Sequence, residues 1–176
     1  MIILPVAISG AGKSTYGEQL KEKIKNLVIV CPDQFRLLLT GDISNHTMEP
    51  RVWMEVAKAL EENVIAGKTV YFDATNLTKR NRKTVMDIAK KYEQEVIAVI
   101  FHTSLRPDIC EDRVRRDLGK SVNRSNTLIR DDNGDTVVRR QYKQFGEIMK
   151  NFSAFEKELE ENSKSYRIKY IECSSE

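Results

Sequence analysis

The segment Ala7-Ile-Ser-Gly-Ala-Gly-Lys-Ser14 constrains the fold of this chain more than any other feature of its sequence. It lies at the end of an apolar run over 2–8 and precedes a helical pattern that includes Leu20 and Ile24. A glycine-bearing turn between a strand and a helix directs backbone N–H groups and the helix N-terminus to one point, where phosphate binds. The segment therefore predicts a P-loop and a site for a nucleoside triphosphate.

Six consecutive residues form this predicted phosphate site: Gly10, Ala11, Gly12, Lys13, Ser14 and Thr15. Lysine in this position adds a point charge for the β- and γ-phosphates, and the hydroxyl that follows it binds Mg²⁺. The strict P-loop pattern has glycine where this chain has Ala7, so an ordinary glycine-rich turn is the alternative. The order of strand, turn and helix favours the P-loop.

Composition indicates a single globular domain over residues 1–176. The chain is 40% hydrophobic and 31% charged, with a formal net charge of +3, which is too small to prove a nucleic-acid partner. Three scattered cysteines form no C-x-x-C pair, and two histidines argue against a histidine-rich metal site. The sequence has no apolar stretch of about 18 residues and no basic start typical of a signal peptide. We expect a cytoplasmic protein with no membrane partner.

Short apolar runs alternate with helical patterns along the chain, which is typical of an α/β fold with a parallel sheet covered on both faces. Pro5 is awkward in this scheme, because proline in a central strand removes a hydrogen-bond donor. The expected strands cover 2–8, 27–31, 69–72, 95–101 and 166–172, and the expected helices cover 52–65, 82–92, 108–118 and one long stretch at 136–161.

Asp33 and Arg36 follow the second expected strand and lie three residues apart, so one helical turn places them on the same face. Ligands of doubly wound sheets bind beyond the carboxyl ends of the strands, so this pair should face the P-loop. An acid there can accept the proton of an attacking hydroxyl, while the arginine holds an anion on the acceptor. The alternative is purely local, because proline and aspartate both suit the start of a helix.

Asp73, Thr75 and Asn76 follow the third expected strand and are predicted to bind substrate. A carboxylate at Asp73 can hold Mg²⁺ or its water, or brace a neighbouring arginine, so it joins Ser14 as a candidate metal ligand. Thr75 and Asn76 can hydrogen-bond phosphates or the acceptor. Their alternative role is that of turn residues ahead of a helix capped by Thr78.

A basic stretch with Arg113 and Arg116 leads into a segment without periodicity, and together they predict a mobile lid over about 113–135. Phosphoryl transfer develops negative charge that a lid arginine can offset. A solvated helix face with local acidic partners is the alternative for either arginine.

In this order and spacing the motifs resemble the kinase domain of bacteriophage-type polynucleotide 5′-hydroxyl kinases over nearly the whole chain. The resemblance implies a three-layer P-loop kinase fold with a parallel sheet of about five strands, and ATP and Mg²⁺ as cofactors. It also implies transfer of the γ-phosphate to the 5′-hydroxyl end of DNA or RNA. The matching pieces are 10–15, Asp33-x-x-Arg36, Asp73-x-Thr75-Asn76 and the arginines from Arg113 to Arg116, whereas the insert 123–134 has no match.

The resemblance assigns roles as well. Asp33 would be the general base, Arg36 would contact the phosphate of the acceptor strand, and Lys13 with the loop hydroxyls would hold ATP and Mg²⁺. The lid arginine would be Arg116 or Arg113. Nucleic-acid 5′ ends would be the partners, and the location would be the host cytoplasm if a phage encodes the protein. The resemblance leaves open whether the chain forms a homo-oligomer.

Two other functions remain open at this point. A P-loop kinase for a small-molecule hydroxyl (a nucleoside, sugar or antibiotic) would share the fold and the donor site and differ only in the acceptor pocket. A nucleotide-dependent switch is less favoured, because the N-K-x-D motif that reads guanine in GTPases is absent. The D-x-D-x-T motif of a phosphatase domain is absent too.

Overall fold

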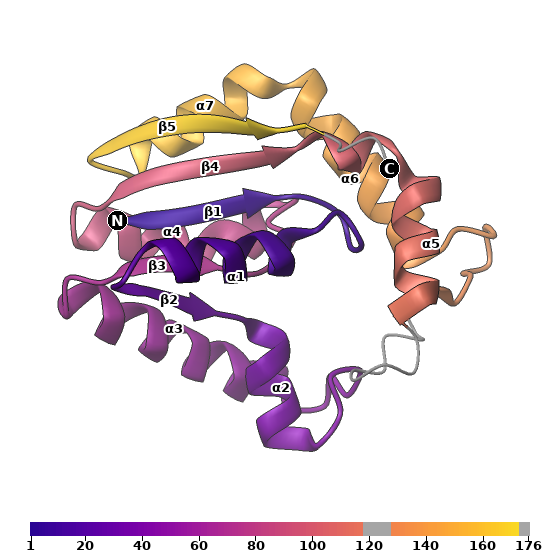
Figure 1. Ribbon diagram of the computed structural model, residues 1–176, viewed down its shortest axis with the longest axis horizontal. Helices are drawn as coiled ribbons and strands as arrows, with labels where there is room; N and C mark the ends of the chain where they lie inside the picture. Colours follow the sequence, from indigo (N-terminus) through magenta and orange to yellow (C-terminus); the bar gives the residue numbers. More distant parts are fainter. Residues whose placement is uncertain (118–127, 173–176) are drawn as a thin grey trace.

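Five short strands form one parallel sheet in the computed structural model, which describes residues 1–117 and 128–172 (Figure 1). The expected α/β class and the five-stranded parallel sheet are thus confirmed, while positions 118–127 of the expected lid lie outside the described residues. The order is β2-β3-β1-β4-β5, with β1 (Ile2–Val6), β2 (Leu27–Val30), β3 (Thr69–Phe72), β4 (Glu95–Phe101) and β5 (Ser165–Ile171).

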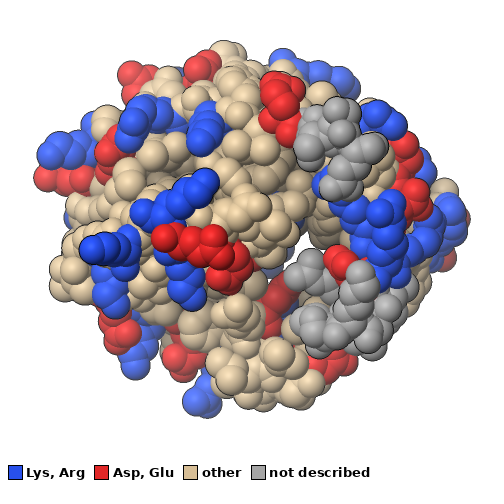
Figure 2. Space-filling view, viewed as in Figure 1, with Lys and Arg blue, Asp and Glu red and all other residues tan. Residues whose placement is uncertain are grey.

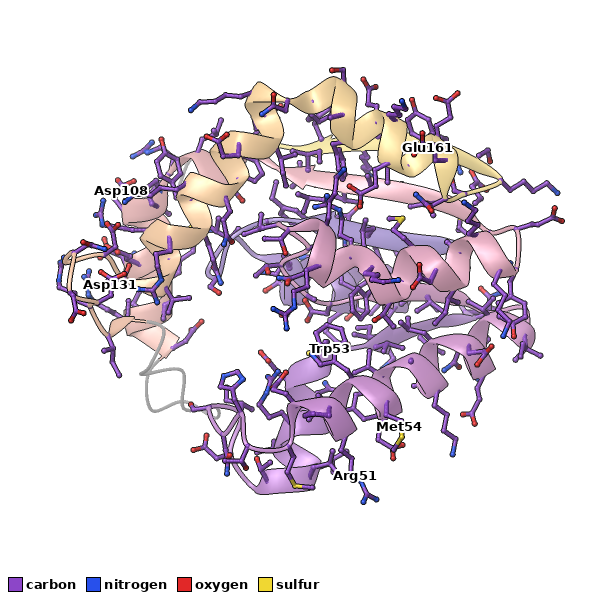
Figure 3. The ribbon with its side chains drawn as sticks, turned by 180° about the vertical axis from the view of Figure 1, so that it is seen from behind. Arg51, Trp53, Met54, Asp108, Asp131 and Glu161 are labelled. Carbon is purple, nitrogen blue, oxygen red and sulfur yellow. The ribbon has the colours of Figure 1, made fainter. Side chains whose placement is uncertain are left out.

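Helices cover both faces of the sheet, as right-handed crossovers between parallel strands require. Helix α1 (Lys13–Lys23) lies on one face, and α3 (Glu49–Ile65), α4 (Lys79–Lys91) and α7 (Phe152–Glu161) lie on the other (Figures 1 and 3). The remaining helices gather beyond the carboxyl ends of the strands: α2 (Pro32–Thr40), the 3₁₀ turn η1 (His102–Leu105), α5 (Pro107–Asp117) and α6 (Val137–Lys150). This end of the sheet is therefore where a ligand site can form.

The central strand β1 is buried throughout, as expected for a parallel strand with helices on both sides. Pro5 fits there because the β1–β3 ladder ends at Ile3, whereas the β1–β4 ladder continues to Val6. The carbonyl of Pro5 instead accepts a hydrogen bond from Asn76 Nδ2 at 2.8 Å, on the side of β3. The missing N–H of proline thus faces a stretch where no ladder bond is needed.

The prediction of one long helix at 136–161 is wrong in one respect, because two helices, α6 and α7, cover this stretch. Asn151 ends α6 and begins α7, with its N–H bonded to the Glu147 carbonyl at 3.1 Å. The break lets α7 turn back over the sheet, where Glu158 pairs with Arg82 of α4 at 2.6 Å. Both of these side chains are almost fully buried, so the pair fixes α7 against α4.

Helix α4 begins at Lys79, earlier than expected, because the side chain of Thr78 accepts a hydrogen bond from the Asn81 N–H. Within residues 1–117 and 128–172, every helix is too short or too polar to cross a membrane.

Candidate active site

The first half of the P-loop is tied to its surroundings by three consecutive backbone amides. Each amide donates to an acceptor outside the loop, and the three acceptors come from three different segments. The bonds run from Ala7 N–H to the Thr75 carbonyl (3.1 Å), from Ile8 N–H to Ser104 Oγ (3.1 Å) and from Ser9 N–H to Gln141 Oε1 (2.8 Å). This half of the loop is a rigid support.

The second half is built in the opposite way. The backbone N–H groups of Gly10, Gly12, Ser14 and Thr15 form no hydrogen bond with the part of the chain that the structure describes. Helix α1 begins there with no side-chain cap and no acidic residue in its first turn. Its N-terminal amides and dipole are therefore directed at whatever lies in front of the loop, which is the arrangement that binds phosphate.

Two glycines and one alanine explain the shape of the loop. Gly10 has a φ of 81°, and a Cβ there would lie 2.3 Å from the Cys110 carbonyl oxygen of α5. Gly12 caps α1 in the left-handed conformation with a φ of 98°. Ala7 lies in the core with a negative φ, so its methyl group replaces the usual first glycine without strain.

Lys13 and Ser14 stand at the start of α1, in front of β3. Lys13 Nζ donates to the Ile8 carbonyl at 2.9 Å, and the Lys13 carbonyl accepts from Tyr71 Oη at 2.7 Å. Tyr71 belongs to β3, and Asp73 follows it by two residues. The bond from Tyr71 therefore joins the start of α1 to β3, the strand that leads to Asp73.

Asp33 and Arg36 contact each other, as the sequence indicated. Arg36 Nη1 donates to Asp33 Oδ1 at 2.5 Å within the first two turns of α2. The exposed fractions differ sharply, since the Arg36 side chain is 7% exposed and the Asp33 side chain 49%. Asp33 is thus the accessible member of the pair, and Arg36 holds it from the interior.

Glu49 completes this pair from the start of α3, 13 residues away in the chain. Its Oε1 accepts from Arg36 Nε at 2.6 Å and lies 2.9 Å from His46 Nδ1, while its Oε2 accepts from Trp53 Nε1 at 3.0 Å. Figure 3 shows Trp53 directed toward the middle of the molecule, unlike Met54 on the outer face of α3. We call Asp33, Arg36, Glu49, His46 and Trp53 the acceptor-side network, after the role that the sequence predicts for Asp33 and Arg36.

Glu49 and Arg36 stabilise each other in their ionised forms within this network. Burial would raise the pKa of Glu49, but the hydrogen bonds from Arg36 and His46 outweigh it, so the pKa lies below the usual value. Burial would lower the pKa of Arg36, but the hydrogen bond to Glu49 and the charges of Asp33 and Glu49 outweigh it. The pKa of Arg36 therefore lies above its usual value. Both groups are therefore ionised at neutral pH.

Asp33 follows β2 and Asp73 follows β3, and the negative charges of both affect the pKa of the Cys31 thiol. Burial, the charge of Asp73 and the charge of Asp33 raise the pKa of Cys31 to about 11. The Asp73 N–H also donates to the Val30 carbonyl of β2 at 2.9 Å. The predicted base and the predicted metal ligand thus both lie near Cys31, at the carboxyl ends of β2 and β3.

Thr75 and Asn76 do not behave alike. Asn76 is fully buried, its Nδ2 donates to the carbonyls of Pro5 and Ala74, and its Oδ1 accepts no hydrogen bond from the described residues, so its contact with substrate stays a prediction. Its role is to join the turn after β3 to β1, with a φ of 53°. Thr75 remains half-buried beside the P-loop, and its carbonyl supports Ala7.

Arg113 and Arg116 project from α5 without an acidic partner among residues 1–117 and 128–172, whereas Arg115 pairs with Asp112 at 2.6 Å. Figure 2 shows Lys and Arg side chains gathered on the side of the molecule that carries α5, across a hollow from the sheet. Both arginines thus keep their charge for a ligand, and both stay candidates for contact with the donor phosphates.

Mg²⁺ fits this site without a cage of protein ligands. No cluster of three or more His, Cys, Asp or Glu residues occurs in the described part of the chain. Mg²⁺ bound with a nucleotide uses one or two protein oxygens together with phosphates and water. The hydroxyl of Ser14 and the carboxylate of Asp73 supply donors of that kind.

Sequence reasoning missed three residues that shape the site: Ser104, Gln141 and Glu49. Gln141 carried a readable signal, because it interrupts the apolar stripe of α6 formed by Val138, Phe145 and Ile148. Ser104 and Glu49 carried none, since each acts through a contact distant in sequence. A cavity of about 260 Å³ lies elsewhere, between α4, α6 and α7, and none of the predicted site residues lines it.

A family model described as an AAA domain matches residues 2–144. The chain belongs to this family. No curated protein sequence matches the chain at a significant level. Among solved structures, a chain of the Pnkp1/Rnl/Hen1 RNA repair complex aligns with a TM-score of 0.69 at 18% identity, over 86% of this chain and 45% of that one. A second Pnkp1/Rnl/Hen1 complex aligns at 0.55 and 22%, over 73% of this chain and 42% of that one.

A gluconokinase from Sinorhizobium meliloti 1021 aligns with a TM-score of 0.53 at 14% identity, over 99% of this chain and 83% of that one. At such identities the likeness shows the fold, and the chain has the P-loop kinase fold. It spans less than half the length of the chains that it matches in the two complexes. The neighbours thus include a chain of an RNA repair complex and a gluconokinase.

Proposed function

We propose that this chain is an ATP-dependent phosphotransferase that moves the γ-phosphate of ATP to the 5′-hydroxyl end of DNA or RNA. The observation that carries the proposal is the acceptor-side network. It presents an accessible carboxylate, Asp33, beside a buried and firmly held guanidinium, Arg36, at the edge of the sheet that also carries the P-loop. That combination suits an acceptor with both a hydroxyl and a nearby phosphate.

The donor site would be the open half of the P-loop. Amides of Gly10, Gly12 and Ser14 would surround the phosphates, and Lys13 would leave the Ile8 carbonyl to reach the β- and γ-phosphates. Mg²⁺, when bound with the nucleotide by Ser14 and Asp73, would neutralise phosphate charge. Arg113 or Arg116 would add positive charge on the opposite side.

The chemical step would begin with the acceptor hydroxyl beside Asp33. The proton of the hydroxyl passes to the Asp33 carboxylate while its oxygen forms a bond to the γ-phosphorus. The bond from that phosphorus to the bridging oxygen breaks, and ADP leaves with the electron pair. Lys13 and the lid arginine offset the charge that develops on the transferred group.

Arg36 would hold the acceptor in place for this step. Its Nε and Nη1 are engaged by Glu49 and Asp33, and Nη2 forms no hydrogen bond with the described residues. The N–H groups of Nη2 would donate to a phosphate of the acceptor strand while Nη1 keeps Asp33 aligned. A hydroxyl one nucleotide unit from a phosphate would then lie near the base.

Transfer of labelled γ-phosphate from ATP to matched oligonucleotides tests the proposal. We expect label on DNA or RNA strands with a 5′-hydroxyl and none on the same strands with a 5′-phosphate. A panel of nucleosides and sugars assayed in parallel covers the alternative. Label on a small molecule with none on any oligonucleotide would replace the proposal with a small-molecule kinase.

A further inference from the structure

Helix α6 carries a polar residue in the middle of its buried stripe. Val138, Phe145 and Ile148 are buried on the inner side of the helix, and Gln141 occupies the same side at helical spacing. Gln141 is half-buried there, and polar groups on such a face are usually hydrogen-bonded. The partner is the Ser9 amide of the P-loop at 2.8 Å, 132 residues away in the chain.

The helix that supplies this contact is itself fixed. Thr136 caps α6 by accepting from the Arg139 N–H, and its hydroxyl donates to Glu111 Oε1 of α5 at 2.6 Å. Arg139 also pairs with Glu111, whose side chain is buried. Gln141 therefore extends from a helix whose start is joined to α5, the helix with the two candidate lid arginines.

Ser9 occupies a decisive place in the loop. It is the last of the three tied amides, and Gly10 beside it begins the half that is open to ligand. Gly10 is already pressed against the Cys110 carbonyl, so the loop has little room on that side. The bond from Ser9 to Gln141 thus sets where the following amides point.

We propose that Gln141 is a positioning residue of the donor site, which holds Ser9 so that the amides after it converge on the phosphates of ATP. The side-chain amide has one possible orientation for this, because only its oxygen can accept the Ser9 N–H. The inference rests on the proposed use of the P-loop as an ATP site and does not depend on the identity of the acceptor.

The test compares two substitutions on the same helix, Gln141→Leu and Gln144→Leu. Leucine at 141 continues the apolar stripe but cannot accept the Ser9 N–H, while Gln144 is exposed and serves as the matched control. We expect the Kd for ATP with Mg²⁺, measured by calorimetry, to rise about tenfold in the first variant and to stay within about twofold in the second. KM for ATP should rise in step, with a smaller change in kcat.

Hydrogen exchange at the Ser9 amide gives a readout that general destabilisation would not mimic. Exchange at Ser9 should accelerate in ligand-free Gln141→Leu, while the unfolding temperature stays near that of the wild type. In Gln141→Glu a carboxylate oxygen accepts the same N–H, so Ser9 should remain protected. Equal ATP affinity in Gln141→Leu and wild type, or equally fast Ser9 exchange in Gln141→Glu and Gln141→Leu, would overturn the inference.

The outcome is separate from that of the proposed function, since ATP binding is measured without an acceptor. If no oligonucleotide is phosphorylated and Gln141→Leu still loses ATP affinity, only the acceptor proposal fails. If oligonucleotides are phosphorylated and the two leucine variants bind ATP equally well, only the role of Gln141 fails.

Discussion

The two ends of the proposed site are built from different parts of the chain. At the donor end, the groups that would bind phosphate are mainly backbone amides within the single segment 7–15, and side chains such as Gln141 hold that segment in place. At the acceptor end, side chains from α2, α3 and the loop between them form an ionic network around Arg36. Substitutions should therefore affect binding at one end and chemistry at the other.

The largest effects are expected from one substitution at each end of the site. These are Lys13→Ala at the donor end and Asp33→Asn at the acceptor end. We expect Asp33→Asn to reduce kcat by ~10²–10⁴, because the amide cannot accept the proton, and to leave the Kd for ATP nearly unchanged. Lys13→Ala should weaken ATP binding and transfer together, because its charge acts on the phosphates. Calorimetry with ATP and single-turnover transfer to an oligonucleotide measure the two properties.

Wild-type turnover by Asp33→Asn would remove the general base from the mechanism. A loss of ATP binding in Asp33→Asn as large as in Lys13→Ala would erase the distinction between the two ends.

An intermediate effect is expected for Glu49→Gln, which keeps the shape of the side chain and removes its charge. Arg36 then lies buried with a weaker partner, so we expect the free energy of unfolding to fall by about 1–3 kcal/mol and kcat to fall with it. Glu62→Gln on the same helix removes an exposed carboxylate and should change stability by less than about 0.5 kcal/mol. Urea unfolding and steady-state kinetics measure both effects.

The same pair of variants gives a pH dependence with a defined sign. The pKa of Glu49 is depressed in the folded protein, so its ionised form stabilises the fold above its ordinary pKa in the unfolded chain. That contribution is lost as pH falls through the lower folded value. The stability difference between wild type and Glu49→Gln should therefore be full at neutral pH and should shrink in acid, and a difference that grows in acid would contradict this.

The smallest effect is expected for Trp53→Phe, which removes the N–H that donates to Glu49 Oε2 and shortens an aromatic ring that packs against the core. Arg36 still holds the other carboxylate oxygen, so we expect a loss of about 0.5–1.5 kcal/mol in stability and a change of a few fold at most in transfer. Circular dichroism is the suitable probe, because the chain has a single tryptophan. A kcat loss as large as that of Asp33→Asn would mean that Trp53 contacts the acceptor itself.

The sequence predicted the elements whose signals are local. The strand at 69–72 was located to the residue, and the strand at 95–101 likewise, because apolar runs between turn residues mark buried parallel strands. The long helix at 136–161 was half right, since its apolar period continues across Asn151 while its backbone does not. The spacing of apolar residues indicates which side of a helix is buried, but it does not indicate where the backbone changes direction.

Asn76 shows the limit for single residues. Its place after a strand predicts a contact with substrate, and the fold shows a structural use that the sequence did not indicate, a hydrogen bond from its amide to the Pro5 carbonyl. Asparagine serves both purposes equally well, so the residue type could not separate them. Only the register of the sheet, in which the β1–β3 ladder ends at Ile3, shows why the Pro5 carbonyl needs a donor from this side chain.

The sequence by itself determined the donor end: the P-loop, its order between a strand and a helix, and the parallel sheet around it. These depend on residues adjacent in the chain, whose main-chain geometry follows from glycine positions and apolar spacing. The tertiary structure alone decided that Gln141 and Ser104 support the loop and that Glu49 holds Arg36 against Asp33. Such contacts join residues far apart in sequence, and a hydrogen bond of that kind leaves no local pattern to read.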